Sequence, residues 1–389
     1  MKNKILWFAG ASLLSLALVF MGCEGPDQPV YDSDHPDPNP PNKNPATVTA
    51  INPASGYFAE TVTITGTNFN PDPTKDLVKF GNRVGNIMNA TTTELTVVTP
   101  GIIGDSVDVS VAIAGSEFWS DPVTFFFKPL PESHDLQVID EEIVWPNGVA
   151  VDGDENIYVG SANDEMIYKI TPDGDKSEFA AASVSGAIHF GPSGYLYVCQ
   201  QNDSNIIRIS PDGSTSEVVV EVESPIDFDW DADGNMFIVS NWSGISKFDG
   251  SELTELVSID NPKCIRVFED YVYVSDIWNS TILRYDMTEN GLENEEVVYS
   301  GDSPLSFDLA SNGLMIFIEA WEISLYTLFQ DGSLGPLMYE EELETPMRYI
   351  VWHGKYLYIV STLNAGADGP GKTLKVYIGL EQAPRYGEQ

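Results

Sequence analysis

Basic residues are scarce in this chain of 389 residues, which has 19 Lys and Arg against 59 Asp and Glu and a formal net charge of −40. Proteins that bind nucleic acid neutralise its phosphates with Lys and Arg, so nucleic acid is excluded as a partner. The same imbalance argues against docking on anionic lipids through protein charge. The four His lie outside the motifs of zinc and serine hydrolases, and we therefore expect no catalytic residues.

Long apolar runs are also missing, with one exception at the N-terminus. Lys2 and Lys4 precede an apolar run over residues 5–21, and a glycine precedes Cys23. This order is typical of a secretory signal, and a Cys at the junction resembles the lipobox of bacterial lipoproteins. The alternative is a plain signal peptide followed by a chance Cys. We expect residues 1–22 to be removed and Cys23 to carry lipid, so that the protein meets the membrane through this anchor only.

Proline concentrates directly after this junction. Residues 23–45 contain seven of the 25 Pro, among Asp, Asn and Gly. Such a run stays extended and does not pack. We expect a tether that separates the folded part of the chain from the membrane.

Residues 46–130 predict a small β-sandwich. Turn residues separate short alternating strands, which we expect at 48–51, 61–65, 78–80, 95–98, 107–113 and 123–127. The phrases "INPASGYFAETVTITGTNFNP", "VKFGNRV", "LTVVTPG" and "VDVSVAIAGSEFWSDPVTFFF" resemble the IPT/TIG immunoglobulin-like family. The resemblance implies a spacer or an interaction module.

From residue 136 to 389 the chain repeats itself. One aromatic residue recurs at intervals of 39, 40, 36, 44 and 41 residues, as Tyr158, Tyr197, Phe237, Tyr273, Phe317 and Tyr358. Four strands per unit of this length indicate the blades of a six-bladed β-propeller, and hence an all-β protein. The last unit lacks a fourth strand, which "LQVIDEEI" at 136–143 could supply. "PNGVAVDGDENIYVGSANDEMIYKITPDG" resembles an NHL repeat.

The two remaining Cys fall in different repeat units. A disulfide needs Cα atoms within about 7 Å, so we expect Cys199 and Cys264 to be buried free thiols.

Residues 366–373 spell the nucleotide-binding pattern G-x-x-x-x-G-K-T. Phosphate binding by this motif requires a helix after Thr373, whereas "TLKVYIGL" predicts a strand. We therefore expect no nucleotide.

A divalent cation is the alternative to an empty propeller axis. The phrase "PNG" resembles a ligand phrase of the gluconolactonase group, and this resemblance implies Asn147 as a ligand, with Asp227 beside it. Lys263 and Arg348 would lie at equivalent positions and repel the cation, and hard cations require several oxygen ligands. We expect no metal site and no cofactor other than loosely bound calcium on the acidic surface.

Three tryptophans predict a binding face. Trp242, Trp278 and Trp321 follow the register aromatic in successive units, in loops that share one face of a propeller. Flat rings flanked by amides and carboxylates suit sugars. The alternative is that the rings pack between blades. Candidate ligand-binding residues are Trp242, Trp278, Trp321, Asn241, Asp276, Asp227 and Arg348.

Charged residues on the inner strands have a structural interpretation. Asp229, Arg266 and Asp308 occupy one register position in three adjacent units. Opposite charges at neighbouring buried positions are expected to pair. His189, inside a strand, is expected to be a hydrogen-bonded structural residue.

These features favour a lipid-anchored cell-surface protein that recognises a polysaccharide or a protein partner without catalysis. A metal-dependent lactonase or hydrolase of the gluconolactonase-like group is the alternative.

The first prediction concerns the anchor. Cys23→Ser should move the protein from the membrane fraction to the soluble fraction, because the lipid is its only membrane contact. Fractionation followed by immunoblotting measures this. A variant that sediments with membranes like the wild type would contradict it. Glu24 and Asp27 favour the outer membrane and the bacterial surface, which protease treatment of intact cells would test.

Overall fold

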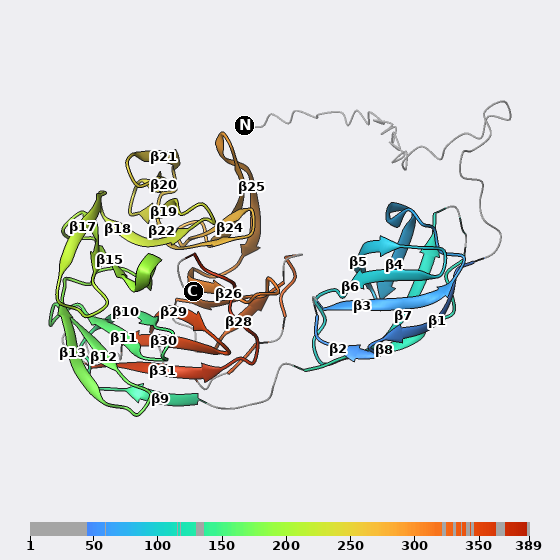
Figure 1. The fold of residues 1–389 in the computed structure, drawn as a ribbon, viewed down its shortest axis with the longest axis horizontal. Helices are drawn as coiled ribbons and strands as arrows, with labels where there is room; N and C mark the ends of the chain where they lie inside the picture. Colours follow the sequence, from blue (N-terminus) through green and yellow to red (C-terminus); the bar gives the residue numbers. More distant parts are fainter. Residues whose placement is uncertain are drawn as a thin grey trace, which may run out of the picture.

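The computed structural model describes residues 45–386 except 59, 115, 117, 130–135, 321–323, 330–331, 336, 340–342, 344–345 and 363–369. The expected signal peptide, Cys23, nearly the whole tether and Trp321 lie outside the described residues. The described regular structure is β-sheet, apart from two short 3-10 turns at Pro73–Lys75 and Pro192–Gly194. No helix in this part of the chain is long and apolar enough to span a membrane. Figure 1 shows a sandwich joined to a ring of sheets.

The N-terminal domain is a β-sandwich with the strand order β1-β3-β6-β5-β4-β7-β8-β2. Alternation along the strands directs every second side chain inward, as in β3, which buries Val62 and Ile64. Three rings, Phe80, Phe125 and Phe127, meet edge to face in the core. The strands are β1 Thr47–Asn52, β2 Ser55–Gly56, β3 Thr61–Thr67, β4 Asp76–Phe80, β5 Arg83–Ala90, β6 Glu94–Val98, β7 Ser106–Ile113 and β8 Val123–Phe127.

Gly66 lies where a side chain would not fit. A Cβ atom there would come within 1.9 Å of the Thr47 carbonyl oxygen and 2.5 Å of the Phe69 ring. Only glycine allows β1 and the Phe69 ring to pack this closely on β3.

The C-terminal domain is a six-bladed propeller, as the repeat predicted. Each register aromatic, from Tyr158 to Tyr358, lies on the second strand of its blade and is buried. Blade one consists of β10 Pro146–Val151, β11 Ile157–Ser161, β12 Met166–Ile170 and β13 Lys176–Ala181. Blade two consists of β14 Ile188–Phe190, β15 Leu196–Gln200, β16 Asn205–Ile209 and β17 Ser216–Glu221. Blade three consists of β18 Pro225–Trp230, β19 Met236–Ser240, β20 Gly244–Phe248 and β21 Leu253–Val257. Blade four consists of β22 Pro262–Phe268, β23 Tyr271–Asp276, β24 Thr281–Thr288 and β25 Gly291–Ser300. Blade five consists of β26 Pro304–Leu309, β27 Met315–Glu319 and β28 Tyr326–Leu328. Blade six consists of β29 Met347–His353, β30 Tyr356–Thr362, β31 Gly371–Tyr377 and β9 Leu136–Asp140.

The ring closes through strand β9, as the sequence predicted. Strand β9 pairs antiparallel with β31, with Leu136 opposite Val376 and Val138 opposite Leu374. The last blade thus takes its outer strand from the start of the domain. Blade five has three strands among the described residues, one fewer than the repeat predicts.

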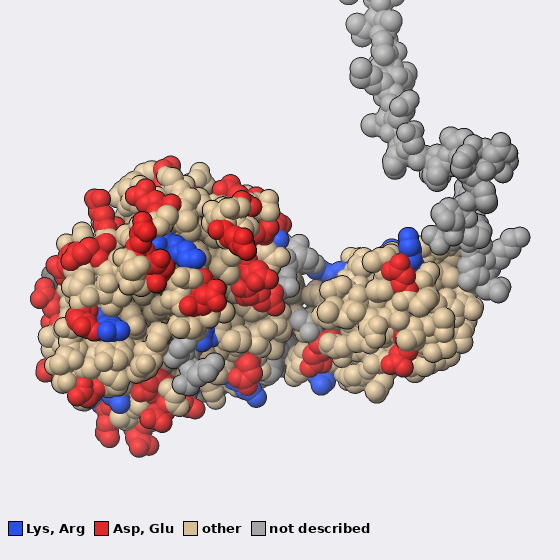
Figure 2. Space-filling model, turned by 45° about the horizontal axis from the view of Figure 1, so that its top comes forward, with Lys and Arg blue, Asp and Glu red and all other residues tan. Residues whose placement is uncertain are grey.

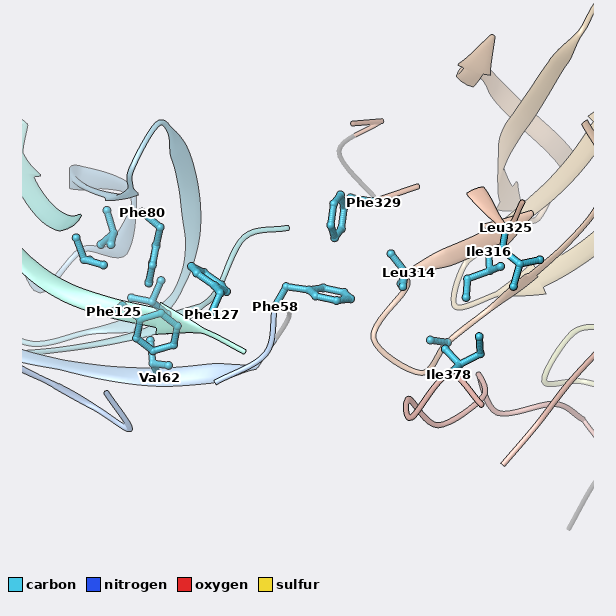
Figure 3. Packing of buried hydrophobic residues seen from close by; sticks show 14 of the residues in the cluster. Phe58, Val62, Phe80, Phe125, Phe127, Leu314, Ile316, Leu325, Phe329 and Ile378 are labelled. Atoms are coloured by element: carbon cyan, nitrogen blue, oxygen red, sulfur yellow. The ribbon is translucent and has the colours of Figure 1, made fainter. Parts of the chain in front are cut away.

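The two domains share one apolar junction (Figure 3). The Phe58 ring of the sandwich meets Phe329 of blade five edge to face, with centroids 5.1 Å apart. Gly101 lies against the same Phe329 ring, and Arg83 donates a hydrogen bond to Ser333. Buried residues of both domains therefore belong to one cluster.

Truncation of Phe58 should weaken the attachment of the sandwich to the propeller. Phe58→Ala removes a buried ring, and such a change commonly costs about 3–5 kcal/mol. We expect calorimetry to show the sandwich melting at a lower temperature while the propeller transition is unchanged. Phe118→Ala, on an exposed ring of the same domain, serves as the control. Equal melting of both variants would show that Phe58 does not couple the domains.

Candidate ligand-binding face

The first strand of every blade begins at the same face of the propeller, around the axis. Neighbouring inner strands contact one another there, for example β10 with β29 and β22 with β26. A cavity of about 340 Å³ opens between their first residues. We call it the axial pocket. All six blades contribute to its wall, through Asn147, Ser185, Ile226, Lys263, Leu305 and Arg348.

The axial pocket carries positive charge. The Nζ of Lys263 donates a hydrogen bond to Asn241 Oδ1 at 3.2 Å. The guanidinium of Arg348 lies 5.1 Å from the centroid of the Trp145 ring, and its Nε contacts Thr362 Oγ1 at 3.4 Å. Burial, together with repulsion from Arg348, lowers the pKa of Lys263. Among the described residues that line the pocket, none is an Asp or Glu.

Trp242 and Trp278 form an exposed pair at the same face. Their side chains are 65% and 59% exposed, and the ring centroids lie 4.9 Å apart in an edge-to-face arrangement. They therefore do not fill gaps between blades. The third predicted ring, Trp321, lies outside the described residues, so its place beside them stays a prediction.

Asp276 holds the loop that presents Trp278. Its Oδ1 accepts hydrogen bonds from the backbone amides of Trp278 and Asn279, and its Oδ2 accepts one from the Asn279 side chain. Asp276 is itself buried. It positions the Trp278 loop, and its own contact with a ligand stays a prediction.

Asn241 connects the Trp pair to the axial pocket. It precedes Trp242 in the chain, and its side-chain oxygen accepts the hydrogen bond from Lys263. Arg348, predicted as a ligand-binding residue, lines the pocket itself. The Trp pair and the pocket thus form one surface across blades three, four and six. Trp145 was not predicted, because its position before β10 has no aromatic counterpart in other units.

The structure corrects the placement of Asp227, which was predicted to join the ligand-binding residues. Asp227 is 1% exposed and lies 2.8 Å from both His189 Nε2 and Arg266 Nη1. Burial alone would raise the pKa of Asp227, but Arg266 and His189 hold it below its usual range. Its oxygens are therefore occupied inside the propeller and do not reach the exposed Trp pair.

Inner-strand charges pair across blades, as predicted for Arg266 and Asp308. Arg266 bridges Asp227 and Asp308, and Asp308 also pairs with Arg385 of the C-terminal segment. Asp229 instead accepts a hydrogen bond from the Val267 amide. Burial lowers the pKa of His189. A neutral ring with its proton on Nε2 fits the contacts to Asp227 and to Arg385.

These residues do not fit a divalent cation. Asn147 donates its side-chain hydrogen bond to the Val184 carbonyl, Asp227 is taken up by Arg266, and Lys263 and Arg348 occupy the pocket. Hard cations require several oxygen ligands. In the described ranges no three His, Cys, Asp or Glu side chains come together in a group that could hold a metal. The Asp152 carboxylate, in a turn rich in acidic residues, accepts hydrogen bonds from the backbone amides of Asp154 and Asn156 and from the Tyr158 hydroxyl.

A larger cavity of about 700 Å³ lies at the other end of β18, between blades three and four. Its wall contains many carboxylates, including Asp231, Asp233 and Glu269, and one Lys, Lys247. No exposed aromatic ring lies in it. Figure 2 shows that acidic side chains are spread widely over the propeller, so this acidity does not distinguish a site.

Removal of Arg385 should destabilise the propeller. Arg385→Met leaves a buried carboxylate, Asp308, without its closest cation, and breaking a buried pair in this way costs about 3–5 kcal/mol. The free energy of unfolding in urea measures the loss. Lys355→Met, which breaks an exposed pair with Glu381, should cost less than about 1 kcal/mol. Equal losses in the two variants would show that the buried network does not stabilise the ring.

Comparison with known proteins supports the two-domain architecture. A structural genomics protein of unknown function from Bacteroides thetaiotaomicron is 15% identical, with a TM-score of 0.52 over 87% of this chain and 98% of that chain. A gluconolactonase from Xanthomonas campestris is 16% identical, with a TM-score of 0.53 over 62% of this chain and 89% of that chain. The calcium-binding protein regucalcin from Agrobacterium tumefaciens is 14% identical, with a TM-score of 0.54 over 65% of this chain and 96% of that chain. At these identities the likeness shows the fold alone.

No curated protein sequence matches this chain significantly. The family model of the IPT/TIG domain matches residues 46–127. The chain therefore consists of an IPT/TIG domain followed by a six-bladed β-propeller.

Proposed function

We propose that this protein is a lipid-anchored, cell-surface binding protein that recognises a polysaccharide on the propeller face without catalysis. The observation that carries the proposal is the pair of exposed rings, Trp242 and Trp278, at the face where the axial pocket opens. Large exposed apolar side chains that gather on a soluble protein mark binding sites. Flat aromatic faces suit the apolar faces of sugar rings, and the flanking amides suit their hydroxyls.

The Trp278 loop is already ordered in the absence of ligand, which favours binding. Asp276 fixes the Trp278 loop through three hydrogen bonds before any ligand arrives. A site that is already ordered loses less conformational entropy when a ligand binds. The Trp pair therefore suits repeated capture of a sugar chain by a tethered protein.

Catalysis has less support. The gluconolactonase likeness extends to the fold only, and the residues at the axis do not fit a divalent cation. Titratable groups at the axis, such as His189 and Asp227, are paired with one another below the surface. Because they are buried and paired, neither of these two groups is placed to act as a general base on a substrate in the axial pocket.

The Trp pair is tested by truncation. Trp242→Ala and Trp278→Ala should each weaken binding about thirtyfold, because an aromatic anchor commonly contributes about 2 kcal/mol. Their melting temperatures should change little, since each ring loses mainly its contact with the other, worth about 1 kcal/mol. A glycan array with the signal-free protein identifies the ligand, and affinity gels then measure the variants.

Trp119→Ala is the matched control. Trp119 lies on the sandwich, is 38% exposed and has Lys79 over its ring, so its loss should leave polysaccharide affinity unchanged. A large drop in melting temperature with unchanged affinity in the Trp242 and Trp278 variants would refute the proposal. The proposal would also be refuted if this protein bound no glycan on the array and instead captured a defined surface protein.

A further inference from the structure

The axial pocket concentrates positive charge in a protein that has very little. The chain has 40 more acidic than basic residues, and most described cations of the propeller pair with a carboxylate, as Lys176, Arg208 and Arg284 do. Lys263 and Arg348 differ, because no ion pair joins either of them to a described residue. Both line the same cavity, and no carboxylate is found among the described residues of its wall.

We propose that the axial pocket binds the carboxylate of a uronic acid residue in the polysaccharide. The inference rests on the proposed function, and it adds the chemical class of the ligand. An anion between Lys263 and Arg348 would offset two like charges that repel each other and that no described carboxylate of the pocket wall neutralises.

The setting of Arg348 favours a carboxylate. Its Nε contacts Thr362 and its central carbon lies over the Trp145 ring, and the two terminal nitrogens have no hydrogen bond to any described residue. A guanidinium held in this way presents a planar pair of donors, which matches the two oxygens of a carboxylate. Thr362 and Trp145 thus position Arg348 for such a ligand.

The pKa of Lys263 also favours an anionic ligand. Burial and the nearby Arg348 lower its pKa, and a bound anion would reverse the second effect. The Tyr349 phenol also lines the pocket, and burial raises its pKa, so it remains neutral. The described residues of the pocket wall therefore include two cations and neutral donors, and no carboxylate.

The size and place of the pocket fit a sugar residue. About 340 Å³ lies at the lower end of the range of roughly 300–1,000 Å³ for small-molecule sites. Asn241 joins Lys263 to the Trp242 loop, so a chain seated on the Trp pair leads directly to the pocket. The strong net charge does not prevent this, because physiological salt screens exposed charges beyond about 8 Å.

The test compares a uronate polymer with the same polymer after its carboxyl groups are reduced to alcohols. Polygalacturonate, alginate and hyaluronan are measured on affinity gels against their reduced forms, at one ionic strength. We expect the protein to bind at least one of the acidic polymers, and reduction to weaken that binding at least tenfold, as loss of charge-assisted hydrogen bonds commonly does. Anionic sugars can also carry sulfate esters, and a comparison of the binding of dextran sulfate with that of dextran tests this second source of negative charge.

Charge-removing variants assign the effect to the pocket. Lys263→Met and Arg348→Met should each weaken binding of the acidic polymer roughly tenfold and leave binding of the reduced polymer unchanged. Lys263→Arg should keep the affinity. Lys355→Met makes the same change of net charge at the far end of β29 and should have no effect. Melting temperatures verify that every variant folds.

The outcomes separate the two proposals. If the protein binds only neutral glycans, or binds acidic and reduced polymers equally while the Trp variants weaken both, the uronate inference is wrong and the polysaccharide function stands. Preference for dextran sulfate over all uronates would also overturn it. If no glycan binds at all, the proposed function itself fails.

Discussion

The pairing of β9 with β31 is the interaction on which the rest of the propeller depends. It is the most non-local strand pairing in the domain, because it joins residues 136–140 to residues 373–376. Without it, the ring would leave open edges, which readily pair with other chains. Closure also brings blade one beside blade six, so that Asn147 and Arg348 line the same axial pocket.

Charge is distributed differently at two levels of the axis. In the interior, Arg266 and Arg385 neutralise Asp227 and Asp308, so that buried ions have partners. At the pocket, Lys263 and Arg348 form no ion pair with the described residues. The first arrangement is what stability requires. The second leaves two half-buried cations without a carboxylate partner among the described residues, which is the pattern expected of a site for an anionic ligand.

Much of the fold was predictable because its signal is periodic. The aromatic register identified six blades, and the missing last strand identified β9. Strand β5 was not predicted, because Arg83–Ala90 exposes half of its residues and shows no clean alternation. Blade five departs from the four-strand repeat because β28 has three residues and its outer part is joined by single bridges, such as Leu328 with Leu334.

The candidate site was predictable only in part. Trp242, Trp278 and Arg348 were found because the repeat places them on one face. Asp227 was placed wrongly, because the repeat register gives only the position of a residue along its strand. The register does not show whether the side chain lines the opening or, as for Asp227, is buried against Arg266. The stacking of Arg348 on Trp145 joins the first and last blades. No local pattern contains that contact.

A crystal structure with a bound uronate oligosaccharide would test the account most directly. The account predicts a sugar ring over Trp242 and Trp278 and a carboxylate between Lys263 and Arg348. Sugar bound instead in the acidic cavity at the far end of β18, or on the IPT/TIG domain, would contradict it.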